Sequence, residues 1–187
     1  MEEEISLIME VAEDGMKHSL EHLQKELVKV RTGKASTAML DGLLVAYYGS
    51  PTPLKQVANV TTSDARTIVI QPWEKSMLAP IERAIFEGNF GITPQNDGEV
   101  VRLTIPPLTE DRRRDLVKQV KQLGEDAKVS IRSSRREAME GIKKEIKNGY
   151  PEDAGKHRET EVQHLTDKYS AKVDEILKIK EVDIMTV

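Results

Sequence analysis

Several residue types are absent or scarce in this 187-residue chain, and each absence excludes a class of site or structure. There is no cysteine, which excludes disulfide bonds, thiolate zinc sites and a cysteine nucleophile. No apolar run approaches the roughly 20 residues that span a bilayer, and the start, Met1-Glu2-Glu3-Glu4, resembles neither a signal sequence nor a transit peptide. We therefore expect a soluble, cytoplasmic protein with no membrane partner.

Sequence motifs of catalysis are also missing. Gly88-Asn89-Phe90-Gly91 lacks the lysine and the spacing of a phosphate loop. His18 and His22 are spaced as helical metal ligands, but Ser19 stands where a metalloprotease has glutamate. No Ser/His/Asp arrangement can be argued. We therefore expect no catalytic residues, no metal and no cofactor, and the chain is predicted not to be an enzyme.

The composition that remains favours amphipathic helices. Aromatic residues make up 4% of the chain, apolar residues 38% and charged residues 32%. This is too apolar for a disordered chain and too charged for a large sheet core. Such a chain can bury enough surface if long helices pack together on one face each.

Three segments, at 2–30, 109–148 and 152–180, carry apolar residues at steps of three or four, which predicts helices. In the second segment the stripe consists of Leu116, Val120, Leu123, Ala127, Ile131, Ser134, Ala138 and Ile142. One unbroken helix there would be roughly 60 Å long, so we expect an elongated molecule. The tail from 181 to 187 carries no clear pattern.

Between the first two predicted helices, the spacing of apolar residues changes to the pattern that is typical of β-strands. We expect strands at 43–48, 54–62, 66–71 and 99–105, a short strand at 90–92, a turn at 49–53 and a loop at 93–98. A helix is expected at 77–86, capped by Ser76 and ended by Gly88. The run Ile68-Val69-Ile70 is typical of a strand covered on both faces, and Trp73 is expected to pack.

These elements predict an α+β fold with an inserted domain. Each of the three predicted long helices has one apolar stripe, and all three stripes can be buried only if the helices pack together in one bundle. Residues 1–30 and 106–187 are therefore predicted to form a three-helix bundle, and residues 31–105 a small β/α/β domain inserted into it. Two chain crossings permit bending while limiting rotation, so we expect a hinged molecule. The predicted hinge residues are Val30, Arg31, Thr32, Gly33, Ile105, Pro106 and Pro107.

The second long helix also carries a basic face. At about 100° per residue, one side of it holds Lys121, Lys128, Arg132, Arg135 and Lys143, with Arg136 at the border. From Arg112 to Lys147 there are 12 Lys/Arg and 6 Asp/Glu, although the whole chain has a net charge of −4. A basic surface concentrated on one element of an acidic protein indicates a polyanion partner. An ordinary solvated helix face is the alternative.

Several segments resemble the ribosome recycling factor family, in order and nearly end to end. They are Val30-Arg31-Thr32-Gly33-Lys34-Ala35-Ser36, Leu40-Asp41-Gly42, Tyr47-Tyr48-Gly49-Ser50-Pro51-Thr52-Pro53-Leu54, Ala58-Asn59-Val60, Pro106-Pro107-Leu108-Thr109-Glu110-Asp111-Arg112-Arg113 and Ile131-Arg132-Ser133-Ser134-Arg135-Arg136. The resemblance implies an L-shaped molecule that binds between the ribosomal subunits after termination. Its bundle would lie on large-subunit ribosomal RNA, and the subunits would be split with elongation factor G and GTP.

The resemblance also implies site residues. The family's Arg-x-x-Arg-Arg pattern falls on Arg132, Arg135 and Arg136, and Arg31 matches as well. Lys128 lies one turn before Arg132, where the family often has arginine; lysine keeps the charge but lacks the planar fork of donors.

The leading hypothesis is a non-enzymatic, monomeric translation factor. Lys128, Arg132 and Arg135 would hold ribosomal RNA phosphates, with Arg31 and Arg136 as further candidates. The alternative is a helical adaptor that binds a protein partner through its charged bundle face. Steep salt dependence of binding would favour the RNA hypothesis.

Overall fold

The computed structural model describes residues 1–186, and the chain divides into two compact units. One unit comprises Met1–Arg31 together with Glu110–Val187, and the other comprises Thr32–Thr109. The expected combination of a helical part and a small sheet-containing part is confirmed. No helix within residues 1–186 is both long enough and apolar enough to cross a membrane.

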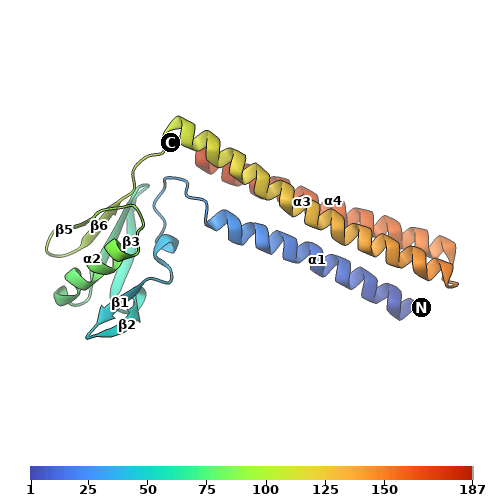
Figure 1. Ribbon diagram of the computed structural model, residues 1–187, viewed down its shortest axis with the longest axis horizontal. Helices are drawn as coiled ribbons and strands as arrows, with labels where there is room; N and C mark the ends of the chain where they lie inside the picture. The colour runs from blue at the N-terminus through green and yellow to red at the C-terminus, as the bar shows by residue number, and fades with distance from the viewer. Residues whose placement is uncertain (187) are drawn as a thin grey trace. The chain divides into compact units, whose positions relative to one another are not determined.

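The helical unit consists of α1 (Glu2–Val28), α3 (Glu110–Lys147) and α4 (Glu152–Met185), which lie side by side (Figure 1). The turn at Asn148-Gly149-Tyr150 separates α3 from α4, so these helices run antiparallel to one another. Helix α1 contacts both of them, as expected of a three-helix bundle. The last helix continues to Met185, through most of the tail from 181 to 187 that carries no clear apolar pattern.

Most residues of the predicted apolar stripes lie in the interior of this unit, but Leu123 and Ser134 of the second stripe are only half-buried. In α3 the buried residues are Leu116, Val120, Gly124, Ala127, Ile131, Ala138 and Ile142. Glycine lets α3 and α4 approach closely: a Cβ added to Gly124 would lie 2.2 Å from Leu177 Cδ1, and one added to Gly155 would lie 2.3 Å from Ile146 Cδ1. A side chain at either glycine would therefore push the two helices apart or force its neighbour to move.

Glu2 ties the first turn of α1 to the turn between α3 and α4. Arg158 Nη2 donates to Glu2 Oε1 at 2.7 Å, and Tyr150 Oη donates to Glu2 Oε2 at 3.1 Å. The hydrogen bond from Arg158, followed by that from Tyr150, lowers the pKa of Glu2. This network fixes the register of α1 against the other two helices.

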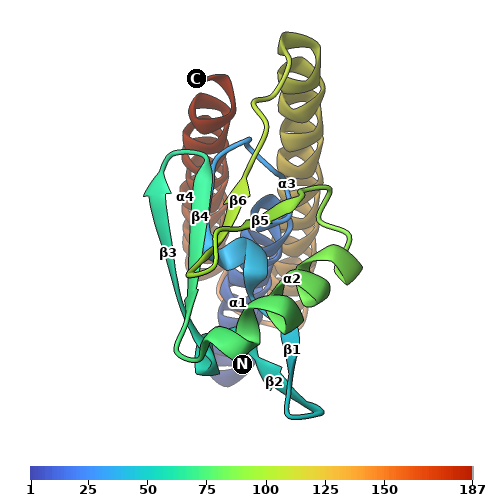
Figure 2. The same ribbon diagram turned by 90° about the vertical axis from the view of Figure 1, so that its left-hand side faces the viewer.

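The second unit is built on a four-stranded antiparallel sheet in the order β3-β4-β6-β5 (Figure 2). Its strands are β3 (Ala58–Asp64), β4 (Thr67–Pro72), β5 (Pro94–Asn96) and β6 (Val101–Thr104). The central pair β4 and β6 aligns Ile68 with Leu103, so that both side chains are fully buried.

A hairpin and one α-helix complete this unit. Strands β1 (Leu44–Tyr47) and β2 (Ser50–Pro53) form a separate two-stranded sheet, and α2 (Leu78–Glu87) packs against the core. The 3₁₀ turns are η1 (Thr37–Leu40), η2 (Leu54–Gln56) and η3 (Lys75–Met77). The buried core is Leu40, Val45, Leu54, Val57, Ala58, Ile68, Ile70, Met77, Leu78, Ile81, Ile85, Val101, Leu103 and Ile105.

Several local predictions were wrong in this unit. Residues 50–53 form a strand rather than a turn, because a two-stranded sheet leaves edge positions where proline is tolerated. Residues 54–56 form a 3₁₀ turn rather than the start of a strand. The short strand lies at 94–96, not at 90–92.

Burial and capping also differ from expectation at single residues. Val69 is only half-buried, so β4 is fully covered on one face, not two. Ser76 does not cap α2, whose N-cap is Met77 without a side-chain hydrogen bond. Trp73 does not pack inside; its side chain is 67% exposed.

Candidate nucleic-acid interface

The solvent-facing side of α3 presents the cations that the sequence singled out. Helix α3 runs without proline from Glu110 to Lys147, so its buried stripe fixes which side chains face outward. Lys121, Arg132, Arg136 and Lys143 are all exposed on it. We call these four residues, with the half-buried Lys128 and Arg135, the α3 basic face.

Arg132 and Arg136 are the most available arginines of the α3 basic face. Arg132 is 54% exposed, and its only ion-pair contact within residues 1–186 is to Glu125 Oε2 at 3.8 Å from Nη2. Both partners are on the surface, where such a contact contributes little and is easily exchanged. Arg136 is exposed and has no ion-pair partner in the described part of the chain. Both guanidiniums can therefore offer their donors to an anion.

Lys128 is already engaged within the protein. Its Nζ lies 2.5 Å from Asp174 Oδ1 on α4, and its side chain is only 25% exposed. The pair links α3 to α4. A phosphate that binds Lys128 has to compete with the Asp174 carboxylate.

Arg135 is also partly committed to α4. Its Nε donates to Gln163 Oε1 at 2.7 Å, and Gln163 Nε2 in turn donates to Asp167 Oδ1 at 3.0 Å. The bond orients the guanidinium along the edge of α4. It uses one of the five N–H donors of the side chain.

Asp174 and Gln163 were missed by sequence reasoning. Both lie on a helix far along the chain from the cations they bind. Only the packing of α3 against α4 brings them together, and no motif marks either residue.

The chain passes between the units at Arg31–Thr32 and at Thr109–Glu110. The hinge candidates Val30 to Gly33 span the first of these points, whereas Ile105, Pro106 and Pro107 lie within the second unit, shortly before the other. Arg31 is exposed just beyond the end of α1. Val30 is buried, and Ile105 belongs to the core of the second unit.

The glycine and prolines of the hinge set differ in their surroundings. Gly33 has φ +77°, and a Cβ added there would lie 2.9 Å from Leu108 Cγ. Gly33 thus packs against the second crossing segment. Pro106 and Pro107 are exposed, and Thr32 is half-buried.

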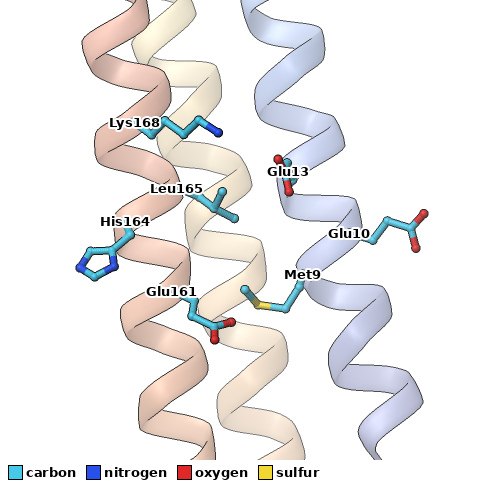
Figure 3. Close-up of a pocket in the computed structure, with 7 residues that line it drawn as sticks. All are labelled: Met9, Glu10, Glu13, Glu161, His164, Leu165 and Lys168. Carbon is cyan, nitrogen blue, oxygen red and sulfur yellow. The ribbon is translucent and has the colours of Figure 1, made fainter.

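A groove between α1 and α4 has the opposite chemistry (Figure 3). Its volume is about 510 Å³, and it is lined by Met9, Glu10, Glu13, Glu161, His164, Leu165 and Lys168. Figure 3 shows Met9 and Leu165 pointing into the space between the helices, whereas Glu10 points away from it. Glu13, Glu161 and the outward-pointing Glu10 outnumber the one lysine of the lining, Lys168, so the groove is unsuited to a phosphate backbone.

One of these carboxylates is held by a buried tyrosine. Tyr169 Oη donates to Glu13 Oε1 at 3.3 Å, and burial is the main cause that raises the pKa of Tyr169. Helix α1 as a whole carries eight Asp/Glu and two Lys. The bundle is therefore electrostatically polarised, with cations on α3 and carboxylates on α1.

Comparison with known sequences identifies the family. A sequence model described as ribosome recycling factor matches residues 23–185. The chain belongs to the ribosome recycling factor family. Among the relatives, the ribosome-recycling factor of Flavobacterium johnsoniae is 52% identical over 187 residues, covering 100% of both chains. That of Porphyromonas gingivalis is 51% identical over 185 residues, covering 98% of this chain and 100% of its own.

Solved structures of the ribosome recycling factor family share the fold. A solution structure of a ribosome recycling factor has a TM-score of 0.79 and 40% identity, and the match covers 98% of each chain. A second structure has a TM-score of 0.64 and 42% identity, covering 97% of this chain and 99% of the other. It represents the T. thermophilus ribosome recycling factor and the E. coli elongation factor G bound to the E. coli post-termination complex. The family is one of non-enzymatic translation factors.

Proposed function

We propose that this protein binds the post-termination ribosome through large-subunit ribosomal RNA and, with elongation factor G and GTP, splits it into subunits. It would act in the cytoplasm as a monomer. Support comes from the family, and from the related T. thermophilus protein bound to the post-termination complex together with elongation factor G.

In this proposal the α3 basic face binds the RNA. The main observation in support is that Arg132 and Arg136 are exposed. Guanidiniums bind phosphates through paired, charge-assisted hydrogen bonds. Such contacts position a protein on RNA without selecting a sequence. Had these arginines been enclosed in internal ion pairs, the proposal would have no binding surface.

Lys128, Arg135 and Arg31 have supporting roles in this proposal. Lys128 can contact phosphate only by leaving or sharing Asp174, so its net contribution is smaller than that of Arg132. Arg135 keeps its outer N–H groups for RNA while Gln163 holds Nε. Arg31 adds a cation beyond the end of α1.

The polarity of the bundle would orient the protein on the ribosome. The α3 basic face is attracted to RNA, whereas the carboxylates of α1 are repelled from it. Because the carboxylates of α1 repel phosphates, the bundle should not bind RNA nonspecifically through all of its faces.

The second unit is assigned to the mechanical step. We propose that elongation factor G acts on the Thr32–Thr109 unit while the bundle stays bound to RNA. The crossings at 30–33 and 105–107 would form the hinge that lets one unit move against the other. Gly33 is the member of this set with a backbone conformation that other residues rarely adopt.

Salt dependence separates this proposal from a helical adaptor that binds protein. We would measure the dissociation constant of the full-length protein for isolated large subunits between low and moderate salt. An RNA contact that neutralises several phosphates should give a log–log slope of about −3 or steeper. A shallow slope, with affinity retained at high salt, would favour the adaptor.

The splitting activity needs its own assay. Light scattering of post-termination ribosomes should fall only when the protein, elongation factor G and GTP are all present. Scattering that falls without the protein, or stays constant with all three, would contradict the proposed function.

A further inference from the structure

The hairpin β1–β2 ends in a strained turn occupied by tyrosine. Tyr47 pairs with Ser50, which leaves Tyr48 and Gly49 as a two-residue turn with φ values of 48° and 80°. Both values are positive, as in the type I′ turn, whose first position favours asparagine or glycine. A bulky side chain there is uncommon. The turn alone gives no reason for the tyrosine.

The side chain of Tyr48 is fixed although no core covers it. It is 80% exposed, yet its Oη donates to Glu74 Oε2 at 3.1 Å. Tyr47 Oη donates to Glu74 Oε1, also at 3.1 Å, and the two rings meet edge to face with centroids 4.6 Å apart. One carboxylate therefore holds both aromatic rings. Strain kept at an exposed, oriented side chain indicates function, not packing.

The charges around the two tyrosine rings indicate which kind of group could bind there. The hydrogen bonds to Glu74 raise the pKa of both tyrosines, so their hydroxyls stay neutral. Glu74 accepts hydrogen bonds from both tyrosines and has no ion pair within residues 1–186, although the exposed Lys75 follows it in the chain. Residues 43–53 include no Lys, Arg, Asp or Glu. The hairpin thus offers electron-rich ring faces and a carboxylate, but no cation for a phosphate.

We propose that Tyr47, Tyr48 and Glu74 form a contact that accepts an arginine or lysine side chain from a protein partner in the ribosomal complex. The cation would lie over the exposed Tyr48 ring, with Glu74 supplying the opposite charge. Exposed tyrosines with a fixed orientation are typical anchors of protein interfaces, because little side-chain entropy is lost on binding. This inference rests on the proposed function for the presence of the complex. It adds a protein contact that is independent of the α3 basic face.

Three variants distinguish the contributions of the Tyr48 ring, the Tyr48 hydroxyl and the negative charge of Glu74. Tyr48→Asn creates the Asn-Gly pair that a type I′ turn favours, so thermal stability should be kept or raised while the ring is lost. Tyr48→Phe keeps the ring and removes only the bond to Glu74. Glu74→Gln keeps an acceptor and removes the charge. A merely structural role would make Tyr48→Asn harmless.

The test compares splitting rates with binding. In post-termination ribosomes with elongation factor G and GTP, Tyr48→Asn should slow splitting roughly five- to thirtyfold, the range expected for a lost cation–π contact. Glu74→Gln should also slow it, and Tyr48→Phe, which keeps the ring but loses the bond that orients it, should slow it less than Tyr48→Asn. Affinity for isolated large subunits should be unchanged in all three, because the α3 basic face is intact.

A photocrosslink identifies the class of partner. Benzoylphenylalanine at position 48 of the full-length protein should crosslink, in the same complex, to a protein segment containing Arg or Lys. Crosslinks to ribosomal RNA alone, or wild-type splitting by Tyr48→Asn while the wild-type protein is active, would overturn this inference only. A wild-type protein that fails to split ribosomes would overturn the proposed function and this inference with it.

Discussion

Individual cations on α3 differ in how much of their binding capacity the protein already uses. Arg132 and Arg136 face solvent, Arg135 donates one N–H to Gln163, and Lys128 is paired with Asp174. Equal formal charge therefore does not mean equal affinity for phosphate. The sequence predicts the face on which these residues lie, but not this ranking.

Asp174→Asn tests the role assigned to Lys128. Removing the carboxylate releases the ammonium and deletes one negative charge beside the RNA surface. We expect affinity for large subunits to rise about two- to fivefold, the effect of an exposed or half-exposed ion pair of up to about 1 kcal/mol. The control is Glu175→Gln, which removes a neighbouring exposed carboxylate. If both variants bind alike, Lys128 is not restrained by Asp174.

Glu2 should contribute to stability in a pH-dependent way. Its pKa is lowered from an ordinary value of 4.5, chiefly by the hydrogen bond from Arg158. A lowered pKa stabilises the fold above the ordinary pKa, and this contribution is lost as the pH falls through the folded value. Glu2→Gln should therefore unfold at a lower temperature than wild type near neutral pH, and the difference should shrink below about pH 4.5. Glu3→Gln is the control; a pH-independent difference for Glu2→Gln would contradict the assignment.

Single-residue predictions from sequence fail where a residue's neighbours come from distant parts of the chain. A lone tryptophan directly after Gln71-Pro72 predicts packing for Trp73, yet its side chain is exposed. The partners of Lys128 and Arg135 lie on α4 and follow only from the packing of the bundle. Local patterns cannot specify such pairs.

Among the elements, the long helices were the most predictable. Their apolar stripes extend over many turns, so the period is unambiguous and the buried residues of α3 follow it. The short elements of the second unit were less predictable. Prolines at 51 and 53 signal a turn, but the edge of a two-stranded sheet accepts them in β2. Strand β5 has three residues, too few to show any period.

The close approach of α3 and α4 depends on glycine. Gly155 is buried, and a Cβ there would lie 2.3 Å and 2.6 Å from two atoms of Ile146. Gly155→Val should therefore destabilise the protein by about 2 kcal/mol through overpacking. The midpoint of thermal unfolding should fall by about 4–8 °C.

Lys156→Val is the matched control for that substitution. It introduces the same side chain at the next position of the same helix, but on the exposed surface. Equal midpoints for the two variants would show that the contact at Gly155 does not limit the packing of α3 on α4.

At the scale of the molecule, the two units are assigned separate tasks. The bundle unit carries the α3 basic face, and the Thr32–Thr109 unit has its own core and carries the hairpin contact. The sequence predicts this organisation because a segment with strand periodicity lies between helices whose apolar stripes can be buried only against one another. The sequence does not predict on which side of the bundle a partner would bind. That depends on which charged faces of α1 and α3 remain exposed after the helices pack.

A bundle without the inserted unit should bind but not split. Replacing Thr32–Thr109 by a short Gly/Ser linker leaves the three helices and their buried stripes intact. We expect this variant to bind large subunits within a few-fold of the full-length protein, with a similar salt slope. It should not split post-termination ribosomes in the light-scattering assay. Splitting by the bundle alone would contradict the mechanical role of the second unit.

The central claim is that exposed guanidiniums on α3 hold ribosomal RNA, and Arg132→Glu tests it most directly. The control is Lys144→Glu, which makes the same charge change at an exposed position about a third of a turn away on the same helix. At moderate salt, we predict that Arg132→Glu weakens large-subunit binding roughly 10- to 100-fold, as expected for lost hydrogen bonds to a charged group. Its unfolding midpoint should stay close to that of wild type, and Lys144→Glu should bind nearly normally. Equal affinities of the two variants, at unchanged stability, would contradict the claim.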